Sequence, residues 1–167
     1  MTMPKSEVGV DLDFTMQTQQ QSQWCWTAVA VSTSLYFKKS SAWTQCSLVN
    51  TQLKQSTCCA DGSTKACNQP SSLREALTTT GNLDHAENAP QAASTIKAQI
   101  EKNRPLGVRV GWGDGSGHVL MATGITEDLK TVTVQDPATG TAYVAYNTLV
   151  NGYQGSGTWN WSYFTQP

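Results

Sequence analysis

The stretch Gln17-Thr-Gln-Gln-Gln-Ser-Gln-Trp-Cys25-Trp-Thr-Ala28 puts a crowded, glutamine-rich loop directly before one cysteine. An Ala-, Val- and Ser-rich run follows from Thr27 to Leu35, with apolar residues recurring at helical spacing. Alanine is the best helix former, so we expect Cys25 to lie in the first turn of a helix that becomes buried.

A cysteine at the start of a helix is chemically favoured as a nucleophile. The unpaired N–H groups and the positive end of the helix dipole favour a thiolate over a thiol, and the thiolate is the reactive form. A glutamine a few residues upstream could donate an amide N–H to an oxyanion formed at the same place. The alternative is a structural cysteine, because free cysteines are among the most buried residues.

The composition narrows the class of protein. At 167 residues, we expect one domain over residues 1–167, with residues 1–10 as a flexible N-terminal arm. The charged fraction of 14% is low, which is typical of a secreted or exported protein with a Ser-, Thr-, Gln- and Asn-rich surface. A net charge of −1 gives no electrostatic basis for binding nucleic acid or anionic membranes.

Neither a membrane span nor a signal peptide is evident in the sequence. No apolar run approaches the ~20 residues that a spanning helix needs. The first ten residues lack the apolar core of a signal peptide. We therefore expect either another export route or a leader absent from this chain.

The five cysteines divide into one and four. Cys25 stands apart, whereas Cys46, Cys58, Cys59 and Cys67 cluster. The odd count leaves one thiol over, and a bridge between the adjacent Cys58 and Cys59 would be strained. Four cysteines allow three pairings, and of the two without that adjacent bridge we prefer Cys46–Cys59 with Cys58–Cys67, while the pairing itself stays open. Disulfides would imply an oxidising destination. A four-cysteine zinc site is the alternative, although adjacent cysteines suit tetrahedral ligation poorly, and we expect no cofactor.

Helical signals fill the first part of the chain. After an alternating segment at 8–14, which predicts a short strand or extended arm, the helix of Cys25 should end near Lys38-Lys39. Further helices are expected over 43–54, over 72–80 from a capping-box pattern, and over 90–103. The segment 55–70 and the polar segment around His85 are predicted to be loops.

Strand-like segments fill the rest, at 106–112, 117–123, 131–134, 142–146 and 158–164. Helices followed by strands indicate an α+β fold with an antiparallel sheet. Trp159 and Trp161 alternate with Asn160, so we expect both indoles on one sheet face, where a sugar-binding aromatic platform is an alternative to a core role.

One histidine and one aspartate stand at neighbouring strand ends. His118 opens an apolar strand after a glycine-rich run, and Asp136 ends the next strand. A hairpin turning through the polar segment 126–130 would bring them side by side, to within a residue or two of register. A carboxylate there can orient and charge-stabilise an imidazole. Cysteine, histidine and carboxylate, in that order, form the cysteine version of the nucleophile triad.

These residues resemble the papain-like cysteine proteases. Gln19 lies six residues before Cys25, Trp24-Cys25-Trp26 opens the helix, and His118 and Asp136 follow on strands. The pattern is most similar to the compact bacterial branch, which includes staphopain-type enzymes, plant-pathogen effector proteases and bacteriocin-leader peptidases. The chain departs from the papain signature at Ser22, where papain has a cysteine, and in a shorter Cys–His separation.

The resemblance implies a fold in which an N-terminal helical half packs against a C-terminal antiparallel sheet. It implies Cys25 as nucleophile, His118 as general base and then acid, and Asp136 in the place that asparagine fills in papain. Gln19 would form the oxyanion hole with the Cys25 N–H. The neighbouring Gln20, Gln21 and Gln23 compete for this assignment.

The expected function is thiol-dependent hydrolysis of peptide bonds through an acyl-enzyme. A deamidase or acyl transferase with the same triad is the alternative among enzymes, and a disulfide-stapled binding module with an inert Cys25 is the alternative outside them. The expected partners are a protein or peptide substrate and an immunity or inhibitor protein. The protein would be a secreted bacterial peptidase, or an effector or toxin delivered to another cell.

Overall fold

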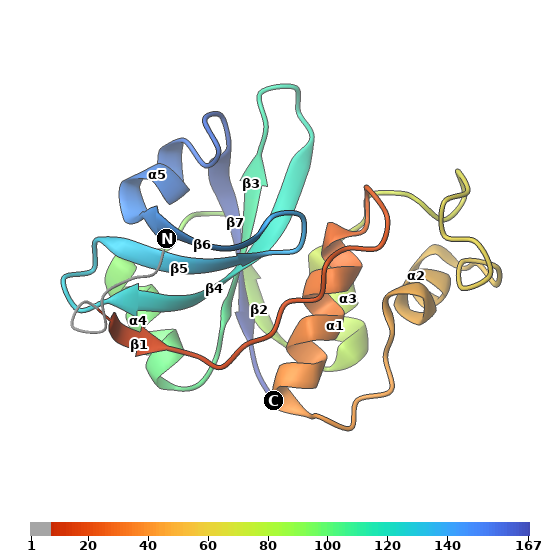
Figure 1. Cartoon of the computed structure of the whole chain (residues 1–167), viewed down its shortest axis with the longest axis horizontal. Helices are drawn as coiled ribbons and strands as arrows, with labels where there is room; N and C mark the ends of the chain where they lie inside the picture. Colours follow the sequence, from red (N-terminus) through yellow and green to blue (C-terminus); the bar gives the residue numbers. More distant parts are fainter. Residues whose placement is uncertain (1–7) are drawn as a thin grey trace.

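The computed structural model describes residues 8–167 and shows helices first and a sheet after them (Figure 1). The helices are α1 (Cys25–Phe37), α2 (Gln45–Leu53), α3 (Leu73–Thr80), α4 (Ala93–Glu101) and α5 (Tyr146–Asn151). The strands are β1 (Val8–Asp11), β2 (Leu83–Glu87), β3 (Leu106–Gly111), β4 (Gly117–Thr126), β5 (Thr131–Asp136), β6 (Gly140–Ala145) and β7 (Thr158–Thr165). All strand pairs are antiparallel, so the predicted α+β class is confirmed.

The sheet has the strand order β2-β7-β3-β4-β5-β6, with β1 paired to β4. Helices α1 and α3 pack on one of its faces, and α4 and α5 contribute to a second core on the other (Figure 1). Leu73 and Leu77 of α3 are buried in the first core, and Ile96 and Ile100 of α4 in the second. Within the described part of the chain, no helix has the length and apolar character needed to cross a membrane.

The cysteine-rich loop between α2 and α3 is held by two disulfides. Cys46 is bonded to Cys59 and Cys58 to Cys67, which is the preferred one of the pairings that the sequence left open. The bonds use all four sulfurs that a zinc site would have required. Cys25 remains the free cysteine.

Removing the buried bridge should destabilise the protein. Cys58 and Cys67 lie in the first core, and replacing both by alanine frees a loop and leaves a cavity. We expect the free energy of unfolding to fall by about 2–4 kcal/mol. Urea titration followed by tryptophan fluorescence measures this change, and the same replacement at the more exposed pair Cys46 and Cys59 is the matched control. An equal loss at both pairs would show that burial of the sulfurs contributes nothing.

Several expectations about the secondary structure are wrong. The segment around His85 is not a loop but the edge strand β2, in which His85 stacks on Phe164 with ring centroids 4.2 Å apart. Helix α5 was not predicted, because six residues are too few to show a helical period. Residues 8–10 pair with β4, so a flexible arm is wrong for them, while residues 1–7 lie outside the described part.

The two tryptophans of β7 lie on opposite faces of the sheet, not on one. The register between β3 and β7 shifts so that Arg109 pairs with Trp161 and the next residue, Val110, pairs with Trp159. This bulge absorbs Asn160 and interrupts the alternation of faces. Trp159 is buried in the second core, and Trp161 packs against the first. A shared aromatic platform is therefore absent from this strand.

Candidate active site

Cys25 begins α1, as the sequence predicts. The preceding residue, Trp24, is the N-cap and makes no side-chain capping bond. The indoles on either side of the cysteine donate instead to the disulfide loop, Trp24 Nε1 to Cys67 O at 2.8 Å and Trp26 Nε1 to Gln69 O at 2.9 Å. Both rings are almost fully buried, so the stapled loop fixes the position of the half-buried sulfur.

His118 and Asp136 are brought together by the β4–β5 hairpin. His118 Nε2 lies 2.7 Å from Asp136 Oδ1, and the aspartate side chain is fully buried. The Ala138 N–H donates to the same oxygen at 2.8 Å. The predicted juxtaposition of the two residues is confirmed. The imidazole nitrogen that contacts Asp136 is Nε2.

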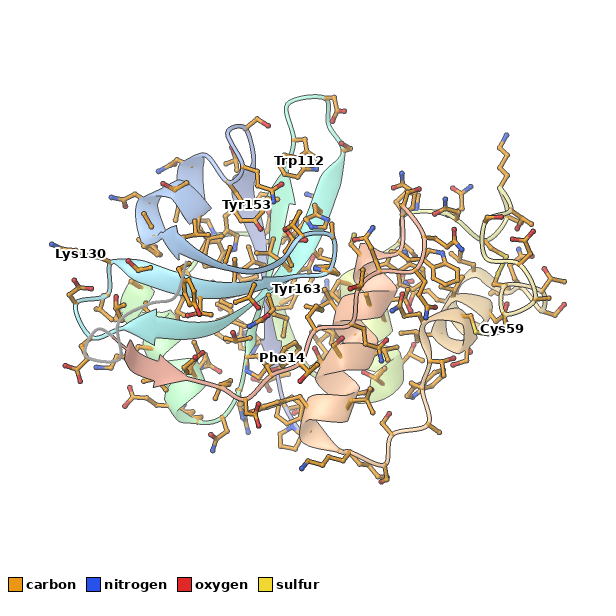
Figure 2. All side chains as sticks on the ribbon, in the orientation of Figure 1. Phe14, Cys59, Trp112, Lys130, Tyr153 and Tyr163 are labelled. Atoms are coloured by element: carbon orange, nitrogen blue, oxygen red, sulfur yellow. A yellow bond between two sulfur atoms is a disulfide. The ribbon has the colours of Figure 1, made fainter. Side chains whose placement is uncertain are left out.

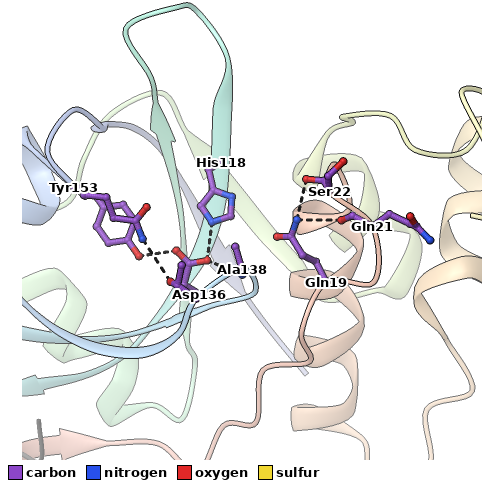
Figure 3. Close-up of polar contacts among 9 residues, drawn as sticks. Gln19, Gln21, Ser22, His118, Asp136, Ala138 and Tyr153 are labelled. Atoms are coloured by element: carbon purple, nitrogen blue, oxygen red, sulfur yellow. Dashed lines mark hydrogen bonds and ion pairs between the residues drawn. The ribbon is translucent and has the colours of Figure 1, made fainter. Parts of the chain in front are cut away.

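Tyr153 is a fourth member of this chain of polar groups, and it was not predicted. Its buried O–H donates to Asp136 Oδ2 at 2.6 Å, so the carboxylate lies between His118 and Tyr153 (Figure 3). Burial and the neighbouring Asp136 charge raise the pKa of Tyr153 far above its ordinary value, which keeps the phenol a donor. A tyrosine in the glycine-rich turn at 152–157 was the available signal, but no spacing rule connects that turn to β5.

The site favours a charged imidazole. Burial lowers the pKa of His118, but hydrogen bonds to Asp136 and Cys25 and their negative charges outweigh it and raise this pKa to about 9. Burial raises the pKa of Asp136. The hydrogen bond and charge of His118 and the hydrogen bonds from Tyr153 and Ala138 outweigh this effect, so the pKa lies below its ordinary value. Because Nε2 faces Asp136, Nδ1 is the nitrogen left for the Cys25 sulfur.

Gln19 belongs to the loop before α1, on the side of the loop that faces His118 (Figure 3). Its backbone N–H donates to Pro137 O at 2.9 Å, which ties the loop to the end of β5. Its Nε2 donates to Gln21 O at 3.1 Å and Ser22 O at 2.9 Å, and its buried Oε1 has no partner within residues 8–167. The side chain of Gln21 points away from His118 (Figure 3).

A buried glutamine on α2 holds this loop, and this role was not predicted from its position in the sequence. Gln45 accepts from the Gln20 N–H at 3.0 Å and donates to Gln17 Oε1 and Thr18 O, each at 3.0 Å. Its own carbonyl accepts from Thr27 Oγ1 at 2.9 Å. The glutamine-rich segment is thus braced from α2. Polar residues on a short helix gave no reason to expect this.

The β3–β4 connection forms the other side of the site. Trp112 follows β3 at the start of this connection (Figure 2). Its ring is roughly parallel to the His118 ring, with an interplanar angle of 20° and 6.3 Å between the ring centroids. Gly115 adopts a positive φ of 89°, a backbone conformation that favours glycine. Trp112 N–H and Ser116 O are bonded at 2.8 Å, so the turn is closed.

The arrangement can perform nucleophilic catalysis. A sulfur at an uncapped helix start faces an imidazole whose other nitrogen is held by a buried carboxylate, which is the arrangement of an activated nucleophile, its base and an orienting group. Among residues 8–167 there is no group of three His, Cys, Asp or Glu side chains that could hold a metal ion.

Comparison with solved structures gives the same fold. The peptidase domain of Streptococcus ComA, a bi-functional ABC transporter involved in quorum sensing, matches with a TM-score of 0.59 at 16% identity, covering 92% of this chain and 98% of that one. A double glycine motif protease from an AMS/PCAT transporter, in complex with the leader peptide, matches with a TM-score of 0.51 at 18% identity, covering 99% and 97%. No curated protein matches the sequence.

A family model settles the membership that the motifs suggested. The model described as papain-like cysteine protease AvrRpt2 matches residues 6–153, a range that includes Cys25, His118, Asp136 and Tyr153. The expected resemblance to compact bacterial papain-like proteases is confirmed. The chain belongs to the AvrRpt2 family of papain-like cysteine proteases.

Proposed function

We propose that this protein hydrolyses peptide bonds with Cys25 as nucleophile, His118 as proton carrier and Asp136 as the group that orients His118. One observation carries the proposal: the His118 ring lies between the buried Asp136 carboxylate, at 2.7 Å, and the free sulfur at the start of α1. A structural cysteine would have no need of such a pair.

The reaction proceeds in two halves. The Cys25 thiolate attacks the carbonyl carbon of the scissile bond, and the protonated His118 donates its proton to the leaving amine as the C–N bond breaks. The neutral imidazole then takes a proton from water, whose oxygen attacks the thioester. The C–S bond then breaks, the acid product leaves, and Cys25 is again a thiolate beside the His118 imidazolium, which keeps the proton taken from water. Asp136 stabilises each imidazolium form without itself accepting the proton.

The oxyanion hole would be formed by the Cys25 N–H and the Gln19 amide. The start of α1 offers N–H groups that no side chain caps, and the helix dipole favours negative charge there. Gln19 is the loop glutamine on the His118 side (Figure 3). To donate to an oxyanion, its Nε2 must release Gln21 O or Ser22 O, so substrate binding would redirect one of these two bonds.

The first experiment is a mass-spectrometric map of thiols after brief treatment with an epoxide inhibitor of papain-like proteases at mildly acidic pH. We expect one adduct, on Cys25, with the other four cysteines bridged. An ordinary buried thiol reacts slowly at this pH, because the thiolate is the reactive species. Iodoacetamide serves as a second reagent of different shape.

The outcomes separate the candidate functions. An unmodified Cys25 in the intact folded protein would overturn the proposal and favour an inert binding module. A second outcome is that Cys25 is modified but no peptide is cleaved. Conversion of a side-chain amide to an acid would then favour a deamidase, and transfer of an acyl group to an amine would favour an acyl transferase. Mass spectrometry of an incubated peptide pool distinguishes a cut chain from a mass change of a single side chain.

The two disulfides support work in an oxidising compartment. We propose that the protein is secreted or delivered to another cell as an effector or toxin. A producer of such a protease would need an inhibitor or immunity protein against it. The test is pull-down from the producing cell with the Cys25→Ala variant. A captured partner that stays on the bait in competition with excess epoxide-labelled enzyme, but is lost in competition with unlabelled enzyme, would be located at the site.

A further inference from the structure

A row of three residues crosses the sheet directly after the candidate histidine. Arg109 on β3 is paired with Val119 on β4 and with Trp161 on β7, so the three side chains lie side by side on one face. Val119 follows His118 in the sequence, and Trp161 packs against the same core as Cys25. The row therefore lies on the face of the sheet that meets α1, the helix that Cys25 begins.

This row is the floor of a cavity between the sheet and the helical half. The cavity has a volume of about 440 Å³ and is lined by Ser71, Ser72, Leu73, Arg74, Arg109, Val119, Trp161 and Tyr163. Tyr163 lies between the sheet and α1 (Figure 2). Arg74, on the first turn of α3, faces Arg109 across the space. The chain has three arginines, and two of them line this cavity.

The positive charge of the cavity is not neutralised by the protein. Neither guanidinium forms an ion pair with a carboxylate of residues 8–167. Arg109 Nη1 donates instead to the neutral Asn160 Oδ1 at 3.0 Å. Gly117 allows this, because a side chain at 117 would collide with the guanidinium. The fold thus holds Arg109 in place and leaves its charge free.

The charges of Arg109 and Arg74 also act on the pKa of the Tyr163 hydroxyl. Burial raises the pKa of Tyr163, the Arg109 and Arg74 charges oppose this rise, and the Cys25 charge adds to it. Both arginines and the sulfur are therefore electrostatic neighbours of one buried phenol. Two guanidinium groups, a phenol O–H and an indole wall suit a planar anion, because arginine pairs with carboxylates through two parallel N–H donors.

We propose that this cavity binds an acidic side chain of the substrate, so that the protease cuts peptides carrying Asp or Glu at one position beside the scissile bond. The inference rests on the proposed function. Arg109 is a specificity residue in this scheme, since it contacts a side chain of the substrate and not the reacting atoms. Arg74 contributes from the opposite wall.

The test compares matched peptides for both cleavage and binding. Quenched-fluorescence peptides carry Glu or Gln in turn at each position around the cut, and cleavage by the wild-type enzyme gives kcat/KM. We expect Glu to exceed Gln about 10- to 100-fold at a single position, the size of a charge-assisted hydrogen bond. Fluorescence anisotropy with the Cys25→Ala variant measures the binding of the same peptides without turnover.

Variants assign the preference to the cavity. Arg109→Met should abolish the Glu preference, so that the ratio of kcat/KM for the Glu and Gln peptides falls to about one, and Arg109→Lys should retain only part of the preference. Lys130→Met removes one positive charge from the exposed β4–β5 turn and is the matched control. A control that lowers the preference as much as Arg109→Met would assign the effect to overall charge and overturn the inference.

The cleavage and binding measurements together distinguish an error in the cavity proposal from an error in the proposed function. Cleavage with equal rates for Glu and Gln at every position would overturn the cavity proposal and leave the protease intact. Selective binding of Glu peptides without cleavage of any peptide would support the cavity and overturn peptide hydrolysis. If the peptides are neither cleaved nor bound selectively, both proposals fail.

Discussion

Cys25→Ala and His118→Ala are each expected to lower kcat/KM for a peptide substrate by about 10⁴-fold or more, and the double variant by no more than either single one. The reason is that the imidazolium and the thiolate act as one pair, so removing either group removes the whole nucleophilic route. Initial rates with the best peptide of the positional series measure all three variants.

Two controls keep this result interpretable. Cys25→Ser retains the shape of the side chain but replaces the sulfur by a weak hydroxyl nucleophile, so it should be nearly as inactive while binding substrate normally. Urea unfolding of each variant shows whether the fold survives. If the losses of the two single variants multiplied in the double variant, the residues would act independently and the proposed pair would be wrong.

Asp136→Ala should lower kcat/KM by about 10²–10⁴-fold, because His118 loses the carboxylate that orients its ring and stabilises its charge. Asp136→Asn should cost much less, since an amide oxygen can still accept from His118 Nε2. Both variants remove the negative charge that helps hold the pKa of His118 at about 9. In the wild type, activity should therefore fall as the pH rises through about 9, and in both variants this alkaline limb should move to lower pH.

The pH dependence of kcat/KM from pH 5 to 10 is the measurement. Glu127→Gln removes an exposed carboxylate from the β4–β5 turn and should leave both the rate and the alkaline limb unchanged. Tyr153→Phe removes the donor to Asp136 Oδ2 and leaves that oxygen buried without it, so a smaller loss of activity is expected. An alkaline limb that stays in place in Asp136→Asn would exclude His118 as the titrating group.

Local patterns gave most of the fold and the main residues of the site. The helix of Cys25 and the hairpin that joins His118 to Asp136 follow from spacing and turn chemistry. The strain of an adjacent bridge excluded one of the three disulfide pairings, and the structure has the preferred one of the remaining two. These features are short-range or depend on a single turn. When two strands are joined by one short polar turn, the position of the turn determines which residues of the two strands lie opposite each other.

Features that depend on three-dimensional packing were missed. The edge strand β2 is largely polar, and its residues do not alternate between buried and exposed, so its sequence shows no strand pattern. The bulge that separates Trp159 from Trp161 exists only relative to the partner strand β3. Tyr153 reaches Asp136 from a turn that follows α5, and Arg74 faces Arg109 from another half of the molecule. No one-dimensional pattern records these approaches.

The stapled loop gives the enzyme two opposite redox requirements. Trp24 and Trp26, the neighbours of Cys25, donate to carbonyl groups of a loop that Cys58–Cys67 closes. Strong reductants would open that bridge and release the indoles, whereas strong oxidants would convert the Cys25 thiol to a sulfenic acid and stop catalysis. If Cys25 is the nucleophile that we propose, the two limits define a window of redox potential in which the Cys25 sulfur is reduced and the Cys58–Cys67 bridge is oxidised. Activity would therefore depend on the redox state of the surroundings. In a strongly reducing cytosol, reduction of the Cys58–Cys67 bridge would limit how long the enzyme stays active.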